Sequence, residues 1–324
     1  MGFLRSWDRS QSGRMSSLRL LSGLLLAAAL LLLWLRLPNP PGGSRDASAP
    51  NRPLAPGRLP QRIVSLSPSI TEILFAIGAG NRLIAVTPFC EYPPEAQKLP
   101  RVGGESGWNI EFLRKLNPDL VLASVIVPAD TVQAIRSSGI TVLAFQHAGM
   151  KGTLEDIRAI GSRVGSAAAE ELLRELNRRQ QKLQARVAST LRTAARPRAL
   201  LLYGMDGLFS AGKTSFAGEI LEFAGGRNIA AAVSGDWPQL SMEFIIRENP
   251  EVLLLAEGYG KGARGNMEQA MRQIRENPSW QLVSAVQSGR VHLVENQLLS
   301  IPGPRMIEAA EKVFAVLHPE RKLS

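Results

Sequence analysis

The chain has 324 residues, of which 45% are hydrophobic and 20% charged, so it can bury a large core and is not a disordered protein. Its single cysteine, Cys90, excludes an internal disulfide and a zinc site built from several thiolates. The net charge is +10, but residues 61–324 hold 30 basic and 26 acidic residues and so contribute only +4. Such a small excess over a large surface argues against nucleic acid as a partner.

The first 36 residues have the pattern of an export signal. Four arginines precede residues 20–35, an apolar run without charge, and a basic flank followed by an apolar core is typical of these signals. The only small-residue cleavage candidate, residues 47–49, is distant from that core and is followed by proline. We therefore interpret residues 1–36 as a signal or signal-anchor segment, with the uncleaved anchor favoured. Either form places the rest of the chain outside the cytoplasm, in the periplasm of a cell that has one.

A tether follows the signal. Residues 37–60 contain seven prolines and three glycines without any periodicity, which predicts a semi-extended linker rather than a domain. Folded structure is expected from about residue 62.

The next segments alternate between strand and helix patterns. Apolar strands are predicted at 62–66, 83–86, 120–122 and 141–145. Ser69 and Glu72 have the spacing of a capping box, which predicts a helix that begins at Ser69 and ends near residue 77. Strands that alternate with helices indicate an α/β protein with parallel sheets.

An internal repeat divides the remaining chain. Residues 109–122 recur at 241–254 without a gap, and Glu, Phe, Asn and Pro are identical at four equivalent positions. Each copy predicts a capped helix, a stop at Asn-Pro and a strand. Chance similarity of two helix–strand units is the alternative, but two similar α/β lobes, residues 61–164 and 197–319, fit better.

A long helix is predicted between the two lobes. Residues 166–192 lack glycine and proline, and leucine or valine recurs there at helical spacing. A helix that pairs with a coiled-coil partner is the alternative, but a rigid connection between the lobes is simpler.

Several motifs of residues 61–318 resemble one family. RIVSLSPSITEILFAIG (62–78), CEYPPEA (90–96), NPDLVL (117–122), WPQLS (237–241) and PGPRMIEA (302–309) are similar to motifs of the substrate-binding proteins of ABC importers for cobalamin, haem and ferric siderophores, and most similar to those of the cobalamin-binding members. The resemblance implies an α/β fold of two Rossmann-like lobes joined by one long helix. It also implies a binding protein that is not an enzyme, needs no cofactor and delivers a metal chelate to a permease dimer with its ATPase subunits.

The resemblance also implies where the ligand binds. Phe89, Tyr203 and Trp237 match aromatic positions that line the cleft between the lobes, and Trp108 and Phe209 are expected nearby from their positions in loops. Aromatic faces suit a broad, flat and partly apolar corrin ring. Each of these side chains has a simpler interpretation as part of an ordinary core.

The cleft differs from that of the cobalamin binders at several positions. Glu105 and Ser124 stand where those proteins have tryptophans, and residues 297–301 lack an Asp and an Arg that they present. The ligand expected is therefore a large metal chelate, with a corrinoid first and haem or a ferric siderophore as the alternatives.

Two glutamates are predicted to contact the permease. Glu111 and Glu243 are equivalent positions of the repeat, each in the first turn of its helix. A carboxylate there also interacts favourably with the helix dipole, which is the simpler explanation. The resemblance implies that both lie on the rims of the lobes and pair with arginines of the permease.

One motif points to a different class of protein. Residues 207–214, GLFSAGKT, match the phosphate-binding pattern GxxxxGK[ST] and follow a predicted strand. A P-loop nucleotide-binding enzyme is therefore the alternative function, although the export signal argues against a cytoplasmic nucleotide as its substrate.

Overall fold

The computed structural model describes residues 57–104, 107–146, 148–205, 207–256 and 263–321. The predicted signal or anchor segment, residues 1–36, and most of the 37–60 tether lie outside these residues. In the described ranges, none of the helices has both the length and the apolar composition needed to span a bilayer.

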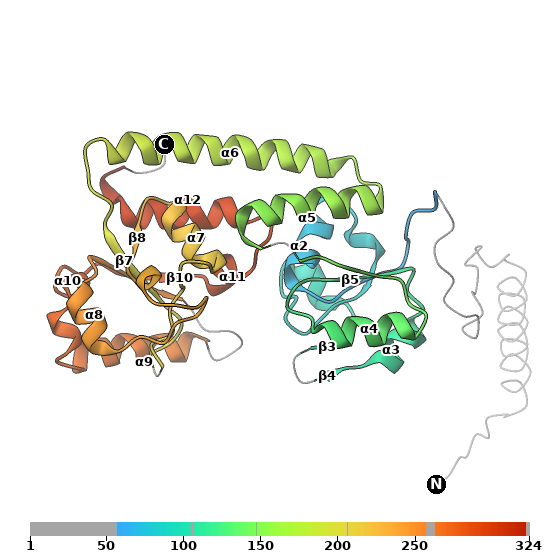
Figure 1. Ribbon diagram of the computed structural model, residues 1–324, viewed down its shortest axis with the longest axis horizontal. Coiled ribbons are helices and arrows are strands. Elements are labelled where there is room, and N and C mark those ends of the chain that lie inside the picture. The colour runs from blue at the N-terminus through green and yellow to red at the C-terminus, as the bar shows by residue number, and fades with distance from the viewer. Residues whose placement is uncertain (1–56, 105–106, 147, 206, 257–262, 322–324) are drawn as a thin grey trace, which may run out of the picture. The chain divides into compact units, whose positions relative to one another are not determined.

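The first lobe is built on a parallel sheet of four strands (Figure 1). The strand order is β2 (Leu83–Ala85), β1 (Ile63–Ser65), β5 (Leu120–Ala123) and β6 (Val142–Ala144). Each matches a strand predicted from the sequence. Neighbouring residues of these strands are buried in different clusters: Leu122 packs in the core with α2 (Pro68–Ala76), and Val121 packs in the core with α4 (Ala129–Ser137). A sheet covered on both faces explains why the strands are almost wholly apolar.

The second lobe repeats this topology. Its strand order is β10 (Val291–Val294), β9 (Val252–Ala256), β7 (Arg198–Leu202) and β8 (Arg227–Asn228), all parallel. Counted along each lobe, both sheets have the order second, first, third, fourth strand. The prediction of an α/β fold with parallel sheets is therefore confirmed, and the two sheets share one strand order.

The repeated helices have the same ends in both lobes. Helix α3 (Ile110–Leu116) is capped by Asn109, and α8 (Met242–Glu248) is capped by Ser241; each cap accepts a hydrogen bond from the backbone N–H three residues later. Both helices end at an asparagine, Asn117 and Asn249, with left-handed φ of 44°. Asparagine tolerates this conformation better than most residues.

The C-terminal end of each repeated helix is hydrogen-bonded to the arginine at the start of the first strand of its lobe. Arg62 donates its Nε–H to the carbonyl of Asn117 at 3.2 Å, and Arg198 donates to the carbonyl of Asn249 at 3.0 Å. Asp119, two residues after Asn117, accepts a hydrogen bond from the backbone N–H of Arg62 at 3.0 Å. Glu251, two residues after Asn249, accepts the equivalent hydrogen bond from Arg198 at 2.9 Å. Equivalent hydrogen bonds in both lobes make chance similarity a poor explanation of the repeat.

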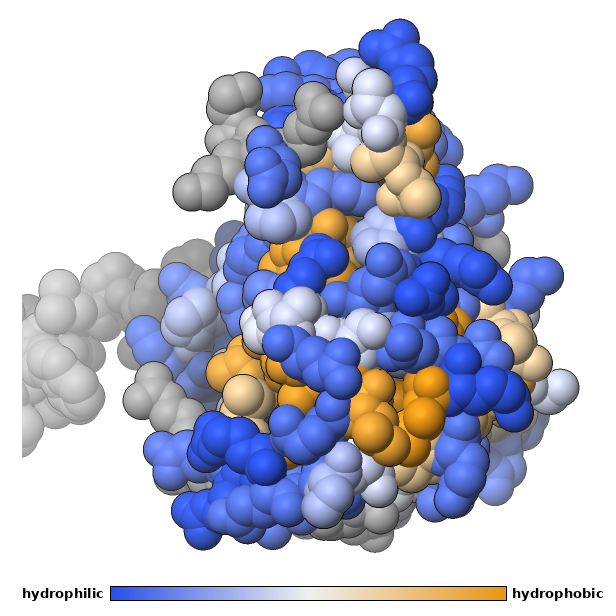
Figure 2. All heavy atoms as spheres, turned by 90° about the vertical axis from the view of Figure 1, so that its left-hand side faces the viewer, coloured by the Kyte–Doolittle hydropathy of each residue, from blue (hydrophilic) through white to orange (hydrophobic). Residues whose placement is uncertain are grey.

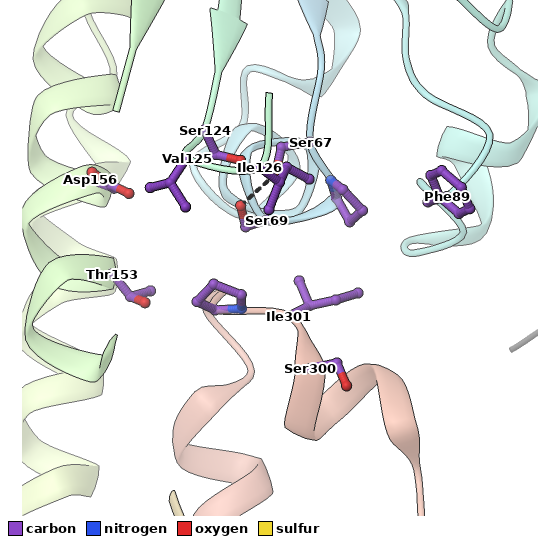
Figure 3. A pocket seen from close by; sticks show the side chains of 12 residues that line it. Ser67, Ser69, Phe89, Ser124, Val125, Ile126, Thr153, Asp156, Ser300 and Ile301 are labelled. Carbon is purple, nitrogen blue, oxygen red and sulfur yellow. Dashed lines mark hydrogen bonds between the residues drawn. The ribbon is translucent and has the colours of Figure 1, made fainter. Parts of the chain in front are cut away.

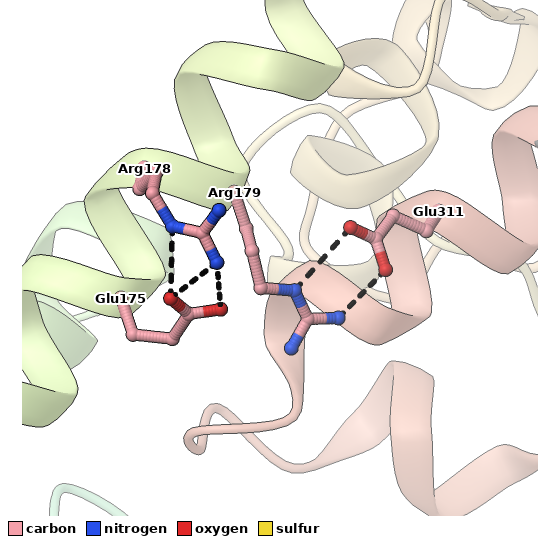
Figure 4. A network of polar contacts seen from close by, with 4 residues as sticks. All are labelled: Glu175, Arg178, Arg179 and Glu311. Carbon is pink, nitrogen blue, oxygen red and sulfur yellow. Dashed lines mark hydrogen bonds and ion pairs between the residues drawn. The ribbon is translucent and has the colours of Figure 1, made fainter. Parts of the chain in front are cut away.

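Helix α6 (Ala168–Leu191) is the long helix predicted at 166–192. At about 1.5 Å per residue it extends about 36 Å, and it runs along both lobes above α5 (Gly149–Val164) and α12 (Met306–Leu317) (Figure 1). Arg179 of α6 pairs with Glu311 of α12 at 2.6 Å, beside the Arg178–Glu175 pair on α6 itself (Figure 4). Beneath α6, one apolar core includes residues of both sheets, so the lobes share buried surface in addition to the connecting helix.

Shorter elements complete the fold. A two-stranded antiparallel pair forms from β3 (Gly103–Gly104) and β4 (Gly107–Trp108). The remaining α-helices are α7 (Phe216–Phe223), α9 (Ala263–Glu276), α10 (Ser284–Gln287) and α11 (Asn296–Ser300). Single 3₁₀ turns occur at Gly80–Arg82, Pro94–Lys98, Ile229–Ala232, Trp280–Leu282 and Pro319–Arg321.

The outer end of the second lobe has a mainly hydrophilic surface. Hydrophilic side chains cover most of it, and apolar ones occur in small separate areas (Figure 2). Scattered exposed apolar residues of this kind are normal for a folded protein.

The predicted capping box at α2 is wrong. The helix begins one residue earlier, with Ser67 as N-cap and no side-chain capping hydrogen bond. The Glu72 side chain is 3% exposed and pairs instead with Arg305, which precedes α12 in the second lobe. Burial of that carboxylate at the lobe interface explains why it does not turn back toward its own helix end.

Candidate functional site

A cavity of about 390 Å³ lies where the loops after the first-lobe strands face the second lobe. In a parallel sheet, the carboxyl ends of the strands lie at one edge, where ligands commonly bind. The lining combines loops after β1, β2 and β5 with α5 and the segment between α11 and α12 (Figure 3): Ser67, Pro68, Ser69, Phe89, Ser124, Val125, Ile126, Thr153, Asp156, Ser300, Ile301 and Pro302.

The first lobe contributes hydroxyl groups to this cavity. Ser67 and Ser69, in the turn into α2, share a hydrogen bond of 2.8 Å between their Oγ atoms. Ser124 Oγ is buried and has no hydrogen-bond partner among the described residues. A ligand with a polar edge could supply that partner, since a buried hydroxyl without one costs free energy.

The opposite wall is mainly apolar. Ile301 faces the serine loops across the cavity, while Thr153 and Asp156 lie on the side formed by α5 (Figure 3). Pro302, which follows Ile301, also lines the cavity. On the first-lobe side, Val125 and Ile126, which follow Ser124 in the chain, are 50% and 64% exposed. Large apolar side chains so exposed beside a cavity indicate a surface that a ligand can cover.

Phe89 lies at the edge of this cavity and is 42% exposed. Its ring packs over Gly104, where an added Cβ would lie 3.0 Å from a ring carbon. The loop that carries Phe89 is held from the second lobe, because Gln297 Nε2 donates to Glu91 at 2.5 Å and the Arg305 guanidinium stacks on the Tyr92 ring at 3.9 Å. This predicted site residue therefore has a fixed place between the lobes.

Arg305 also forms the most buried ion pair of the described residues. Its Nε and Nη2 donate to the two carboxylate oxygens of Glu72 at 2.9 Å and 2.5 Å, with side chains 16% and 3% exposed. Burial raises the pKa of Glu72, and the hydrogen bonds from Arg305 offset part of that effect. The pair joins α2 to the start of α12 and so fixes the two lobes together behind the cavity.

A second cavity of about 370 Å³ adjoins the first and shares Phe89 and Ile126 with it. Trp108, predicted only from its position in a loop, lines this second cavity. The full lining is Leu66, Thr87, Phe89, Gly104, Trp108, Ile126, Pro128, Asp130 and Thr131.

The predicted aromatic residues of the second lobe lie outside the lining of both cavities. Tyr203 follows β7, so it lies at the carboxyl end of the second sheet, and its ring contacts Trp237 edge to face at 5.0 Å. Trp237 and Phe209 are 48% and 44% exposed, and Phe209 forms a bridge with Gln239 next to this pair. Three of the predicted residues thus come together, but on the second lobe alone.

Residues 207–214 do not have the structure of a P-loop. In that motif the Lys-Ser/Thr pair opens the helix, whereas here the α7 N-cap is the following residue, Ser215, which accepts from the Gly218 N–H at 3.0 Å. The loop packs instead on residues 235–239: a Cβ on Gly212 would lie 1.9 Å from the carbonyl oxygen of Gly235, and Thr214 donates to Asp236. The backbone N–H groups of Ser210 and Gly212 donate to the carbonyls of Pro238 and Asp236, so these two are not free to hold a phosphate.

Glu111 and Glu243 are both exposed, in the first turns of α3 and α8. Both helices lie on the side of their lobes away from α6 (Figure 1). Glu111 pairs with Arg114 on its own helix at 3.3 Å, and hydrogen bonds from its own N–H and from Ser241 lower the pKa of Glu243. Both side chains are therefore exposed where a partner could contact them.

Sequence reasoning missed most of the residues that line the first cavity. Ser124 was expected at the cleft from the resemblance, whereas Val125 and Ile126, which follow it after β5, were not singled out. Asp156 gave no signal, because it reaches the cavity only through the packing of α5, whereas Ile301 belongs to residues 297–301, which the resemblance placed at the cleft. Within the described part of the chain, no three His, Cys, Asp or Glu side chains gather as a metal site would require.

Comparison with known proteins agrees with this arrangement. The chain is 29% identical over 280 residues to an uncharacterised ABC transporter substrate-binding lipoprotein, YvrC, of Bacillus subtilis, covering 85% of each chain. It is 32% identical over 298 residues to a cobalamin-binding protein of Halobacterium salinarum, covering 87% of this chain and 79% of that one. The crystal structure of the periplasmic vitamin B12-binding protein BtuF of Vibrio cholerae matches with a TM-score of 0.68 and 27% identity, covering 82% of this chain and 99% of that one.

The match also extends to a family model. Residues 63–298 match the model described as periplasmic binding protein. This range includes both sheets, the long helix and the whole lining of the second cavity, while Ser300, Ile301 and Pro302 of the first cavity follow it. The chain therefore belongs to the periplasmic binding protein family.

Proposed function

We propose that this chain is the substrate-binding component of an ABC importer and that its ligand is a cobalamin-like corrinoid. The observation that carries the proposal is the cavity between two similar lobes, bordered by exposed aromatic and apolar side chains at the carboxyl ends of the strands. A flat, partly apolar chelate can cover such side chains, and each one covered contributes about 1–3 kcal/mol. The cobalamin-binding relatives and the BtuF structure support this ligand class.

As the family implies, the chain acts by holding and releasing a ligand and not by catalysis. The aromatic pair Tyr203–Trp237 and Phe209 would contact the ligand from the second lobe, and Phe89 and Trp108 from the first. The metal would arrive inside the chelate, so the protein need not provide a complete set of metal ligands.

The ligand is tested by titrating the purified full-length chain, in detergent, with cyanocobalamin while tryptophan fluorescence is measured. Saturable quenching is expected, and Trp237→Ala should weaken binding by about 1–3 kcal/mol. Trp280 is 2% exposed in the second-lobe core, so Trp280→Phe is the control and should leave the affinity unchanged. Saturation with haemin or a ferric siderophore but not with cyanocobalamin would replace the corrinoid with one of those ligands.

Glu111 and Glu243 are proposed as the permease contacts. Two exposed carboxylates at equivalent places on the two lobes can meet two arginines that are related by the symmetry of a permease dimer, which fixes orientation as well as adding attraction. Glu111→Arg combined with Glu243→Arg should abolish transport and permease binding while ligand affinity stays within about threefold. Charge reversal of Glu170 and Glu171 on α6 is the matched control and should leave transport intact.

The N-terminal segment is proposed as a membrane anchor on the outer side of the cytoplasmic membrane, with residues 37–60 as the tether. The relative from Bacillus subtilis is named a lipoprotein. The only cysteine of this chain, Cys90, is buried in the first lobe and is no site for a lipid, so the apolar run itself would hold the membrane. Retention of the full-length chain in carbonate-washed membranes is expected, and release of the intact protein by that wash would contradict the anchor.

A further inference from the structure

The second cavity differs in character from the first. Its lining adds a carboxylate, Asp130, and the hydroxyls of Thr87 and Thr131 to an otherwise apolar wall. Because it shares Phe89 and Ile126 with the first cavity, a ligand too large for one space can extend a substituent into the other. We refer to the second cavity as the side compartment.

Asp130 is the one charged residue among the described residues that line this second cavity. It lies in the first turn of α4, where its Oδ1 accepts the backbone N–H of Thr131 at 2.7 Å, and the residue is exposed. A carboxylate at a helix N-terminus is favoured by the helix dipole. Among the residues that the structure describes, no arginine or lysine pairs with it.

Among the described residues, the lining of the second cavity holds no basic side chain. Two arginines that contact the Phe89 loop, Arg305 and Arg101, are hydrogen-bonded to groups of the protein. Arg305 pairs with Glu72, and Arg101 donates to the backbone carbonyls of Thr87, Cys90 and Gln97. A carboxylate on a ligand that enters beside Asp130 would meet like charge, which opposes binding.

We propose that the cleft selects its ligand by charge, and that Asp130 accepts a hydrogen bond from an N–H-bearing substituent, such as a peripheral amide, inserted into the side compartment. The proposal rests on the function proposed above and narrows it to chelates that are neutral or cationic at their edge. Chelates that present carboxylates to this compartment are rejected.

The test compares cyanocobalamin with its separated monocarboxylate isomers, in each of which one peripheral amide is replaced by a carboxylate. Binding of each to the full-length chain is measured by calorimetry. At least one isomer is expected to bind about tenfold more weakly than the parent. Asp130→Asn should reduce that difference to about threefold or less, because it removes the repelling charge and keeps the side-chain shape. Glu171→Gln, an exposed change on α6, is the control and should leave the difference unchanged.

Two results would overturn the charge selection. One is that every isomer binds within about twofold of the parent, and the other is that Asp130→Asn leaves the discrimination intact. Failure of cyanocobalamin itself to bind would overturn the proposed corrinoid instead, and the charge selection is then tested with haemin against its dimethyl ester. The ester, which lacks the carboxylates, is expected to bind more tightly, and preference for free haemin would refute the inference.

Discussion

The ion pair between the lobes can be tested by removing its cation. Arg305→Met keeps much of the side-chain length but leaves the Glu72 carboxylate, 3% exposed, without its partner. Breaking a buried pair from one side costs about 3–5 kcal/mol. The same substitution at Arg179, whose pair with Glu311 has side chains 32% and 25% exposed, is the matched control and should cost about 1 kcal/mol or less.

The stability that Arg305→Met loses should become smaller as the pH falls. Burial raises the pKa of Glu72 above its ordinary value of 4.5, and without Arg305 nothing offsets that effect. As the pH falls toward the raised pKa, the folded variant binds a proton that the unfolded chain, with its ordinary pKa, does not yet bind. The stability deficit of Arg305→Met is therefore expected to shrink by about 1.4 kcal/mol for each unit by which the pKa rises in the variant.

Urea unfolding at about pH 7.5 and about pH 5.5, followed by circular dichroism, measures both effects. Glu72→Gln with Arg305→Met should recover much of the loss, since no buried charge is then left alone. A cost for Arg305→Met no larger than that for Arg179→Met, with no change between the two pH values, would refute the role of the pair.

Three further outcomes are expected. Gly104→Ala places a methyl 3.0 Å from the Phe89 ring, so it should weaken ligand binding about threefold or more while unfolding changes by less than about 1 kcal/mol; equal binding would place Phe89 outside the site. Gly212→Ala puts its Cβ 1.9 Å from the Gly235 carbonyl and should lower the unfolding free energy by about 1–3 kcal/mol, as measured in urea. Burial lowers the pKa of His318 below its ordinary 6.5, so the unfolded chain gains the proton first and stability should fall as the pH drops below about 6.5; His318→Gln should flatten that slope, and an unchanged slope would assign it to other groups.

Much of the fold could be predicted because its signals are local. The strands at Ile63–Ser65 and Leu120–Ala123 are short apolar runs between turn residues, and the helix at Ala168–Leu191 lacks helix breakers. The repeat was visible because the same capping and stop residues recur in both lobes. Such patterns follow from backbone chemistry and need no knowledge of tertiary contacts.

The site was harder to predict because its residues meet only through packing. Glu72 has the spacing of a capping box, yet a partner 233 residues later determines its role. Asp156 reaches the first cavity from α5, so its neighbours in sequence do not mark it as a site residue. The aromatic residues were found from a resemblance to a family, and their contact with ligand stays a prediction.

The central claim is tested most directly by competition. The purified chain is exposed to an equimolar mixture of cyanocobalamin, haemin and a ferric hydroxamate siderophore, separated by gel filtration, and examined by visible absorption and mass spectrometry of the retained small molecule. A single corrinoid in about one-to-one ratio with protein is the expected result, since one cleft lies between the two lobes. Retention of haemin or the siderophore in its place, with the corrinoid left in the free fraction, would contradict the account.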